Sequence, residues 1–168
     1  MEESFLREYL PIIIFLGLAV ALGAIGTTPR TIVPLGGMVL GNAMAAAGAA
    51  LDRLGDDVRE AARELEARLS LGATGEQAVR PLAHRSLRTG MVAIVDSTKT
   101  AGLVFIPGTM LGMLLAGADP LDAVRLQIVL FYLLLGSTAV AAVLAVGLAA
   151  RGFFTPAHQL REPGVRRA

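Results

Sequence analysis

Apolar residues dominate four runs of this chain, and each run approaches the length that a helix needs to cross a lipid bilayer. About 20 helical residues, each rising about 1.5 Å, span the hydrocarbon core. The four runs are residues 9–26, 32–51, 91–117 and 126–150. Their abundant glycine and alanine are typical of membrane helices that pack closely on one another. The pattern therefore predicts an all-α, polytopic membrane bundle of four transmembrane helices in a single domain.

One long polar segment, residues 52–90, separates the second run from the third. Four of its apolar residues recur on one helical face: Val58, Ala62, Leu65 and Leu69. This spacing predicts an amphipathic helix over about residues 56–71, in which Glu64 can pair with Arg68 four positions later.

Signals for a turn and a new helix follow at once. Gly72 is suited to a left-handed C-cap, and Thr74 with Gln77 has the spacing of a capping box that opens the next helix. The segment is therefore expected to form a helix, a tight turn and a second helix. Spacing alone leaves open whether this unit contacts a partner or is a solvated hairpin that only links two spans.

Composition strengthens the membrane interpretation. The chain is 54% hydrophobic with a mean hydropathy of +0.63, which is more apolar than one soluble core requires. The formal net charge of +1 says little about binding partners, but arginine is unevenly distributed along the chain. Segment 52–90 carries Arg53, Arg59, Arg63, Arg68, Arg80, Arg85 and Arg88, and the tail carries Arg151, Arg161, Arg166 and Arg167.

The arginine distribution predicts an orientation. Because positive charge favours the cytoplasmic side, segment 52–90 and both termini are expected in the cytoplasm, in a multi-pass protein of the cell membrane or inner membrane. The basic tail, residues 151–168, is expected to be flexible. Beside a membrane, such a tail is expected to bind anionic lipid and not nucleic acid.

Several kinds of chemistry are absent from the sequence. No cysteine is present, so disulfides and thiolate sites are excluded. A P-loop needs glycine directly before its lysine, whereas the one lysine, Lys99, follows Thr98. His84 and His158 lack metal-ligand spacing. The sequence thus indicates no catalytic residues and no cofactor, and it leaves any metal ligand unknown.

Three polar residues in the apolar runs are candidates for a pathway or gate. Asn42 lies in the second run, where a buried amide is expected to bond another helix or to line a pathway. Asp96 and Lys99 lie three residues apart on one helical face, where they can pair near the cytoplasmic mouth. The pair either fixes how its helix enters the membrane or opens and closes during transport.

Two pairs of glycines suggest sites of helix packing, and one aspartate suggests the start of a helix. Gly37 with Gly41 and Gly108 with Gly112 have the four-residue spacing that lets helices approach closely, although small residues are common throughout this chain of 19 glycines. Asp119, followed by Pro120, is expected to cap the start of the last helix.

Longer motifs resemble a known family. EARLSLGATGEQAVR, residues 66–80, resembles the cytoplasmic loop by which ABC-transporter permeases dock on their ATPase. The match is narrower with the iron-export ABC transporter permease family, which also includes plant aluminium-resistance membrane proteins. It rests on VPLGGMVLGNAMAAAG at 33–48, LSLGAT at 69–74 and DSTKTAGLVFIPGTMLGMLLAGADPLDAVRLQIVLFYLLLG at 96–136. Because family members carry further membrane helices before this point, the chain resembles their C-terminal part.

The resemblance implies a permease subunit that exports a metal, iron in relatives, and that is not itself an enzyme. ATP hydrolysis would take place on a separate ABC ATPase, and the permease would form a homodimer or join a partner that supplies the missing helices. The residues that would contact the ATPase are Glu66, Gly72, Ala73, Thr74 and Gln77. The alternatives are a truncated or non-transporting helix-bundle scaffold or interaction protein and, less favoured because no catalytic constellation is present, an intramembrane enzyme.

Overall fold

The computed structural model describes residues 29–101, 106–155, 157 and 159–161. The first predicted span, residues 9–26, and the last part of the tail, residues 162–168, lie outside this part of the chain. The described residues form five helices: α2 (Pro29–Glu60), α3 (Ala62–Ser70), α4 (Gly75–Thr100), α5 (Gly108–Leu115) and α6 (Pro120–Gly152).

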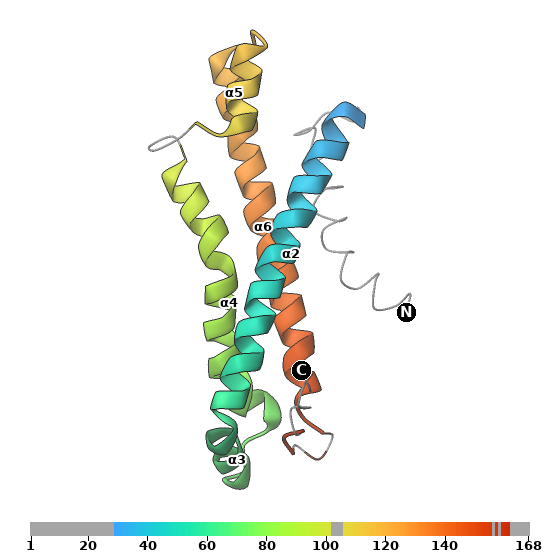
Figure 1. Ribbon diagram of the computed structural model, residues 1–168, viewed down its shortest axis with the longest axis vertical. Coiled ribbons are helices and arrows are strands. Elements are labelled where there is room, and N and C mark those ends of the chain that lie inside the picture. The colour runs from blue at the N-terminus through green and yellow to red at the C-terminus, as the bar shows by residue number, and fades with distance from the viewer. Residues whose placement is uncertain (1–28, 102–105, 156, 158, 162–168) are drawn as a thin grey trace, which may run out of the picture.

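Three long helices lie side by side and make up the body of the molecule (Figure 1). Helix α2 packs against α4 and α6, and α4 also packs against α6. Helices α2 and α6 run in the same direction, and α4 runs in the opposite direction (Figure 1). The short α3 lies at one end of the bundle, here called the α3 end, together with the end of α6, while α5 packs on α6 at the other end.

Buried side chains of α2 recur every three or four residues, as expected for one face of a helix. They are Leu35, Val39, Ala43, Ala46, Ala50, Leu54, Asp57 and Val58. Towards the α5 end they pack with residues of α4 and α6 such as Ile94, Leu130 and Leu134. Towards the α3 end they pack with Leu65, Val79 and Val146. The two clusters form a core that follows the axis of the bundle.

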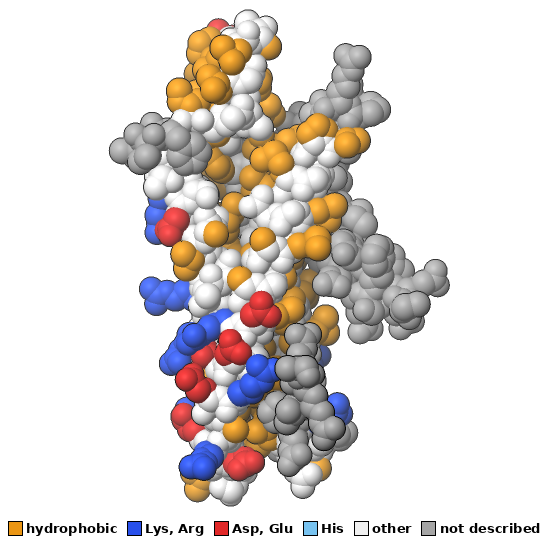
Figure 2. Space-filling view, viewed as in Figure 1, with side chains coloured by type: hydrophobic (Ala, Val, Ile, Leu, Met, Phe, Trp, Pro, Cys, Tyr) orange, Lys and Arg blue, Asp and Glu red, His pale blue; other side chains and the backbone are white. Residues whose placement is uncertain are grey.

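Many large apolar side chains face outward. They include Val33, Met44, Leu121, Ile128, Tyr132, Val143, Leu144 and Leu148. Charged side chains gather instead over α3 and the neighbouring parts of α2 and α4 (Figure 2). An apolar exterior along much of the body, with charge concentrated towards the α3 end, suits a lipid environment. The fold is an all-α membrane helix bundle, as predicted.

Two of the described helices are long and apolar enough to cross a membrane: Val33–Glu60 and Pro120–Gly152. They contain most of the second predicted span, residues 32–51, and all of the fourth, 126–150. Asp119 caps the start of α6, because its Oδ1 accepts a hydrogen bond of 2.8 Å from the backbone N–H of Leu121, and Pro120 occupies the first helical position. The predicted start of the last helix is therefore confirmed.

The prediction of a single helix through the third run, residues 91–117, is wrong. Helix α4 ends at Thr100, Ala101 has an extended backbone, and a separate helix α5 begins at Gly108. Proline lacks the N–H that an uninterrupted helix would need at position 107, and it disfavours a helical backbone at the residue before it. Pro107 instead lies at the N-cap of α5, where no such donor is required.

The predicted helix over residues 56–71 is also divided. Helix α2 continues to Glu60 and bends at Ala61, after which α3 begins. The amphipathic face itself is confirmed, because Val58 and Leu65 are both buried. The bend lets the chain turn across the end of the bundle, where Leu65 packs with Val79 of α4.

Helices α2 and α4 are in close contact at Gly90, a residue that sequence reasoning did not single out. A Cβ added there would lie 2.5 Å from the backbone oxygen of Ala46 and 2.8 Å from the Cβ of Ala50. The fully buried Ser86 lies four positions before Gly90 on the same face of α4. The two helices thus meet through small residues spaced by four, the arrangement expected for close packing in membranes.

The glycine pairs that were predicted to pack do not do so among the described residues. Gly37, Gly41, Gly108 and Gly112 are exposed, and a Cβ added at any of them meets no described atom of a neighbouring element within 4 Å. Four-residue spacing occurs on every face of a helix, and here the helix neighbours lie on a different face.

Candidate functional site

The turn between α3 and α4 has the geometry that its sequence predicts. Gly72 has a φ of +92°, a left-handed conformation that suits glycine. Its backbone N–H donates to the carbonyl of Leu69 at 3.0 Å, and that of Ala73 donates to the carbonyl of Arg68 at 3.1 Å. This pair of bonds is a Schellman motif, which satisfies the last carbonyls of α3 and fixes the direction in which the chain leaves it.

The start of α4 is fixed by a complete capping box. The backbone N–H of Gln77 donates to Oγ1 of Thr74 at 3.3 Å, and the backbone N–H of Thr74 donates to Oε1 of Gln77 at 3.0 Å. Two otherwise unsatisfied donors at the helix N-terminus are thereby paired. The predicted C-cap and capping box are both confirmed. They fix the hairpin formed by residues 62–80, here called the coupling hairpin after the role that we propose for it.

Arg68 joins the two helices of the coupling hairpin. Its guanidinium donates to Oε1 of Glu64 at 2.6 Å within α3, as predicted, and to the backbone oxygen of Ala78 in α4 at 3.3 Å. The latter bond crosses the turn, so the angle between α3 and α4 is held by more than the turn itself. The two helices of the coupling hairpin are therefore held together by a side-chain hydrogen bond as well as by the turn.

The N-terminus of α4 rests on the residues that follow α6. A Cβ added at Gly75 would lie 2.6 Å from the ring of Phe154, which is itself buried. The chain beyond α6 folds back, with Thr155 N–H donating to the Gln159 carbonyl at 2.9 Å and Arg161 N–H donating to the Phe153 carbonyl at 2.8 Å. The expectation of a flexible tail from residue 151 is thus wrong for the described residues up to 161, because this aromatic residue anchors them against α4.

The tip of the coupling hairpin presents an apolar side chain to the surroundings. Leu71 is 88% exposed, although leucine usually lies inside. Glu66, Thr74 and Gln77 are exposed as well, and Ala73 is half-buried. An exposed leucine on a turn with polar neighbours is suited to contact a cleft on another protein.

Asp96 and Lys99 form the predicted pair near the end of α4, with 3.8 Å between Nζ and Oδ1. Both side chains are largely exposed, so the pair contributes little to stability. Ser97, Thr98 and Thr100 each donate a hydrogen bond of 2.8 Å to a backbone oxygen four residues earlier. The last turns of α4 therefore satisfy their hydroxyl donors locally.

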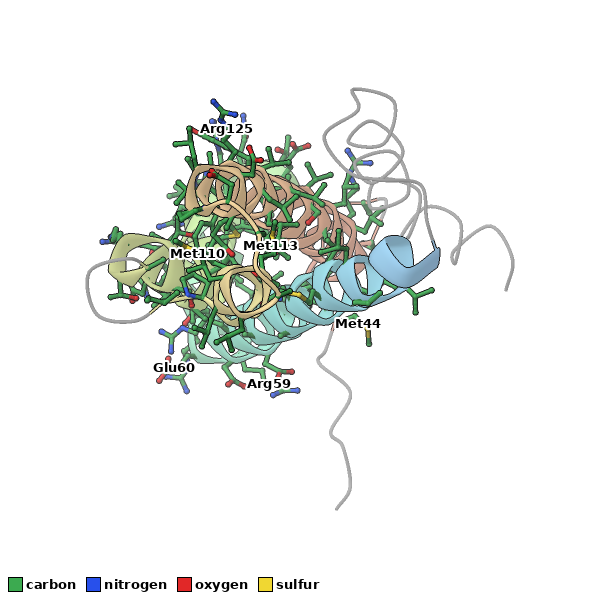
Figure 3. The ribbon with its side chains drawn as sticks, turned by 90° about the horizontal axis from the view of Figure 1, so that it is seen from above. Met44, Arg59, Glu60, Met110, Met113 and Arg125 are labelled. Carbon is green, nitrogen blue, oxygen red and sulfur yellow. The ribbon has the colours of Figure 1, made fainter. Side chains whose placement is uncertain are left out.

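Asn42 does not bond another helix among the described residues. Its Nδ2 donates to the backbone oxygen of Met38, one turn earlier in α2, at 2.8 Å. This bond satisfies one of the two N–H donors of the amide within α2 itself. Met44, close to Asn42 in sequence, points away from the bundle and is exposed (Figure 3). A pathway role for Asn42 stays a prediction.

No group of three or more His, Cys, Asp or Glu side chains that could hold a metal ion occurs among the described residues. Polar side chains do meet inside the bundle, where the Thr109 hydroxyl of α5 donates to Oε1 of Gln127 in α6. This hydrogen bond holds α5 against α6.

The sequence matches a known protein family over most of its length. Residues 4–154 match the family described as "Uncharacterised protein family (UPF0014)". The chain belongs to UPF0014. No solved structure matches it.

Named relatives of this UPF0014 chain occur in bacteria and plants. It is 36% identical over 164 residues to the "Probable iron export permease protein FetB" of Escherichia coli, an alignment that covers 95% of the chain and 63% of FetB. It is 40% identical over 147 residues to the "UPF0014 membrane protein STAR2" of rice, with 88% and 52% covered. It is 39% identical over 144 residues to the "Protein ALUMINUM SENSITIVE 3" of Arabidopsis thaliana, with 86% and 53% covered. The chain thus spans between about half and just under two thirds of these relatives.

Sequence reasoning missed several residues that position the hairpin of this UPF0014 chain. Arg68 was expected to pair with Glu64, and it also donates to the backbone oxygen of Ala78, a contact that the sequence did not suggest. Phe154 was assigned to a flexible tail. The sequence did indicate that Phe154 could be packed, because Phe153 and Phe154 directly follow an apolar helix. Aromatic side chains are strongly favoured in packed contacts.

Proposed function

We propose that this chain is the membrane-spanning permease part of an ABC transporter and that a separate ATPase subunit drives it. The observation that carries the proposal is the coupling hairpin, in which Gly72, the Thr74–Gln77 capping box and Arg68 fix one exposed turn relative to the bundle. A permease needs such a unit, because movement of the ATPase must be passed to the membrane helices without loss in a flexible loop.

The contacts of α4 support transmission from the hairpin to the bundle. Its N-terminus belongs to the coupling hairpin and rests on Phe154, while Gly90 in the same helix lies against Ala46 and Ala50 of α2. A displacement of the turn would therefore reach α2 and the end of α6 through packed side chains. We further propose that Asp96, Lys99 and Asn42 respond to this movement, either along the substrate pathway or at its mouth.

We place the α3 end of the bundle in the cytoplasm. The arginine-rich segment 52–90 and the end of α6 share this end (Figure 1), and the positive-inside rule assigns such a surface to the cytoplasmic side. A cytoplasmic ATPase would then meet the coupling hairpin directly. We also propose that the permease pairs with a second copy of itself or with another membrane subunit.

We propose a metal ion as the exported substrate, with iron as the first candidate. The support is the name of the Escherichia coli relative, "Probable iron export permease protein". The Arabidopsis relative is named for aluminium sensitivity, so aluminium is a second metal to test.

The proposed function is tested by expressing the tagged chain together with an ATPase from a neighbouring reading frame that contains GxxxxGK[ST]. The ATPase is expected to co-purify with the chain. Inverted vesicles that contain both proteins are expected to accumulate iron when ATP is supplied, whereas vesicles with either protein alone should not. A bundle that retains no ATPase and moves no metal would instead be a scaffold.

A further inference from the structure

A cavity of about 820 Å³ lies at the α3 end between α4, the last turns of α6 and the residues that follow α6. Its walls are mainly apolar and include Val79, Leu87, Val146 and Phe154. Three arginines also line it: Arg80 from α4, Arg151 from α6 and Arg161 beyond α6. Glu76 is the one acidic side chain among the described lining residues.

The three cavity arginines differ from many others in the chain. Arg53, Arg59, Arg68 and Arg125 each pair with a carboxylate. Arg80, Arg151 and Arg161 are exposed, and within the described part of the chain none of them lies within ion-pair distance of a carboxylate. Three arginines without a carboxylate partner, from three different segments, therefore line one cavity, and this charge is complementary to an anion.

The apolar part of the cavity continues onto the outer face of α6. Val143, Leu144 and Leu148 line the cavity and are 54%, 40% and 50% exposed, so they are accessible from the side of the bundle. Arg151 follows on the same helix, about 12 Å beyond Val143 along the axis at the rise of an α-helix. An apolar face that ends in cationic side chains matches the change from acyl chain to headgroup in a lipid leaflet.

We propose that this cavity binds one anionic phospholipid of the leaflet at the α3 end. The headgroup phosphate contacts Arg80, Arg151 and Arg161, and an acyl chain lies along Val143, Leu144 and Leu148. Basic pockets between membrane helices are suited to anionic headgroups. An acidic peptide would match the arginines but would leave the apolar wall uncovered. The proposal rests on the membrane bundle and not on ATPase coupling, so either can fail without the other.

The binding test compares two variants of the full chain in vesicles of phosphatidylcholine with added phosphatidylglycerol. In one variant Arg80→Gln and Arg151→Gln are combined. The control combines Arg85→Gln and Arg88→Gln, because both are exposed arginines of α4 without a carboxylate partner among the described residues, but neither lines the cavity. After extraction and purification, retained phosphatidylglycerol is measured by mass spectrometry.

One arginine near an anionic surface contributes about fivefold in affinity, so the double variant is expected to retain about 25-fold less phosphatidylglycerol, while the control retains the normal amount. Equal losses in both variants would mean general surface attraction and would overturn the proposal, as would unchanged retention in the double variant.

A second measurement does not depend on the arginine variants folding normally. Because the chain contains no tryptophan, Leu144→Trp gives a single fluorescent reporter in the cavity, and Ile128→Trp gives one on the exposed face of α6 away from it. Brominated phosphatidylglycerol is expected to quench the reporter at position 144 more strongly than brominated phosphatidylcholine does. At position 128 the two brominated lipids are expected to quench equally. Equal quenching at position 144 by both lipids, or by neither because another protein chain fills the cavity, would overturn the proposal.

Discussion

Replacing Gly72 with valine is expected to weaken association with the ATPase while the protein still enters the membrane. Gly72 has a φ of +92°, and a left-handed backbone costs a residue with a Cβ about 1–2 kcal/mol. That penalty lowers the population of the native turn by roughly 5–30-fold. Since only the native turn aims α4 and presents Leu71 correctly, the affinity for the ATPase, measured with both purified proteins, should fall by a similar factor.

Gly117 offers a matched control for this variant. It has a φ of +83° in the turn between α5 and α6, at the other end of the bundle. Gly117→Val should bring a similar backbone penalty but leave ATPase affinity unchanged. Gly72→Asn should largely preserve association, because asparagine tolerates the left-handed conformation better than valine. If Gly72→Val binds the ATPase normally, the hairpin is only a linker between two helices.

Replacing Gly90 with alanine is expected to destabilise the bundle by about 1–3 kcal/mol, the usual range for overpacking. The new Cβ would lie 2.5 Å from the backbone oxygen of Ala46, which cannot move aside as a flexible side chain could. Helices α2 and α4 would therefore have to separate at this position. The free energy of unfolding can be measured by denaturant titration in one detergent.

Gly41→Ala is the corresponding control in α2. Its added Cβ meets no described atom of a neighbouring element within 4 Å, and alanine is favoured over glycine in a helix by about 0.5–1 kcal/mol. The free energy of unfolding should therefore stay the same or rise. A large loss at Gly41 together with none at Gly90 would show that the helices pack through the faces that the sequence suggested, and not through those in the structure.

Local signals in the sequence predicted local structure well. The C-cap at Gly72, the capping box at Thr74 and Gln77 and the cap at Asp119 each depend on groups within a few residues of one another. Such motifs satisfy backbone donors and acceptors whatever the rest of the chain does. They correctly located both ends of the turn in the coupling hairpin before any tertiary contact was known.

Packing between helices could not be predicted in the same way. Four-residue spacing marked Gly37 and Gly41 as strongly as it could have marked Ser86 and Gly90, but the face that meets a neighbour depends on how the helices are arranged. The apolar run likewise joined residues 91–117 into one span, because proline counts as apolar in such a run and its missing backbone donor does not register. The contact at Gly90 and the break before α5 depend on long-range or backbone effects that apolar periodicity does not describe.

The most direct test of the proposed coupling role uses single cysteines in a chain that has none of its own. Leu71→Cys places a thiol at the tip of the coupling hairpin, and Leu115→Cys places one at the α5 end; these leucines are 88% and 80% exposed. Each purified variant is labelled with a short photoreactive crosslinker in the presence of the ATPase. A crosslinked product that contains the ATPase is expected from position 71 and not from position 115. Equal products from both positions, or none from position 71 when the ATPase is bound, would contradict the coupling role.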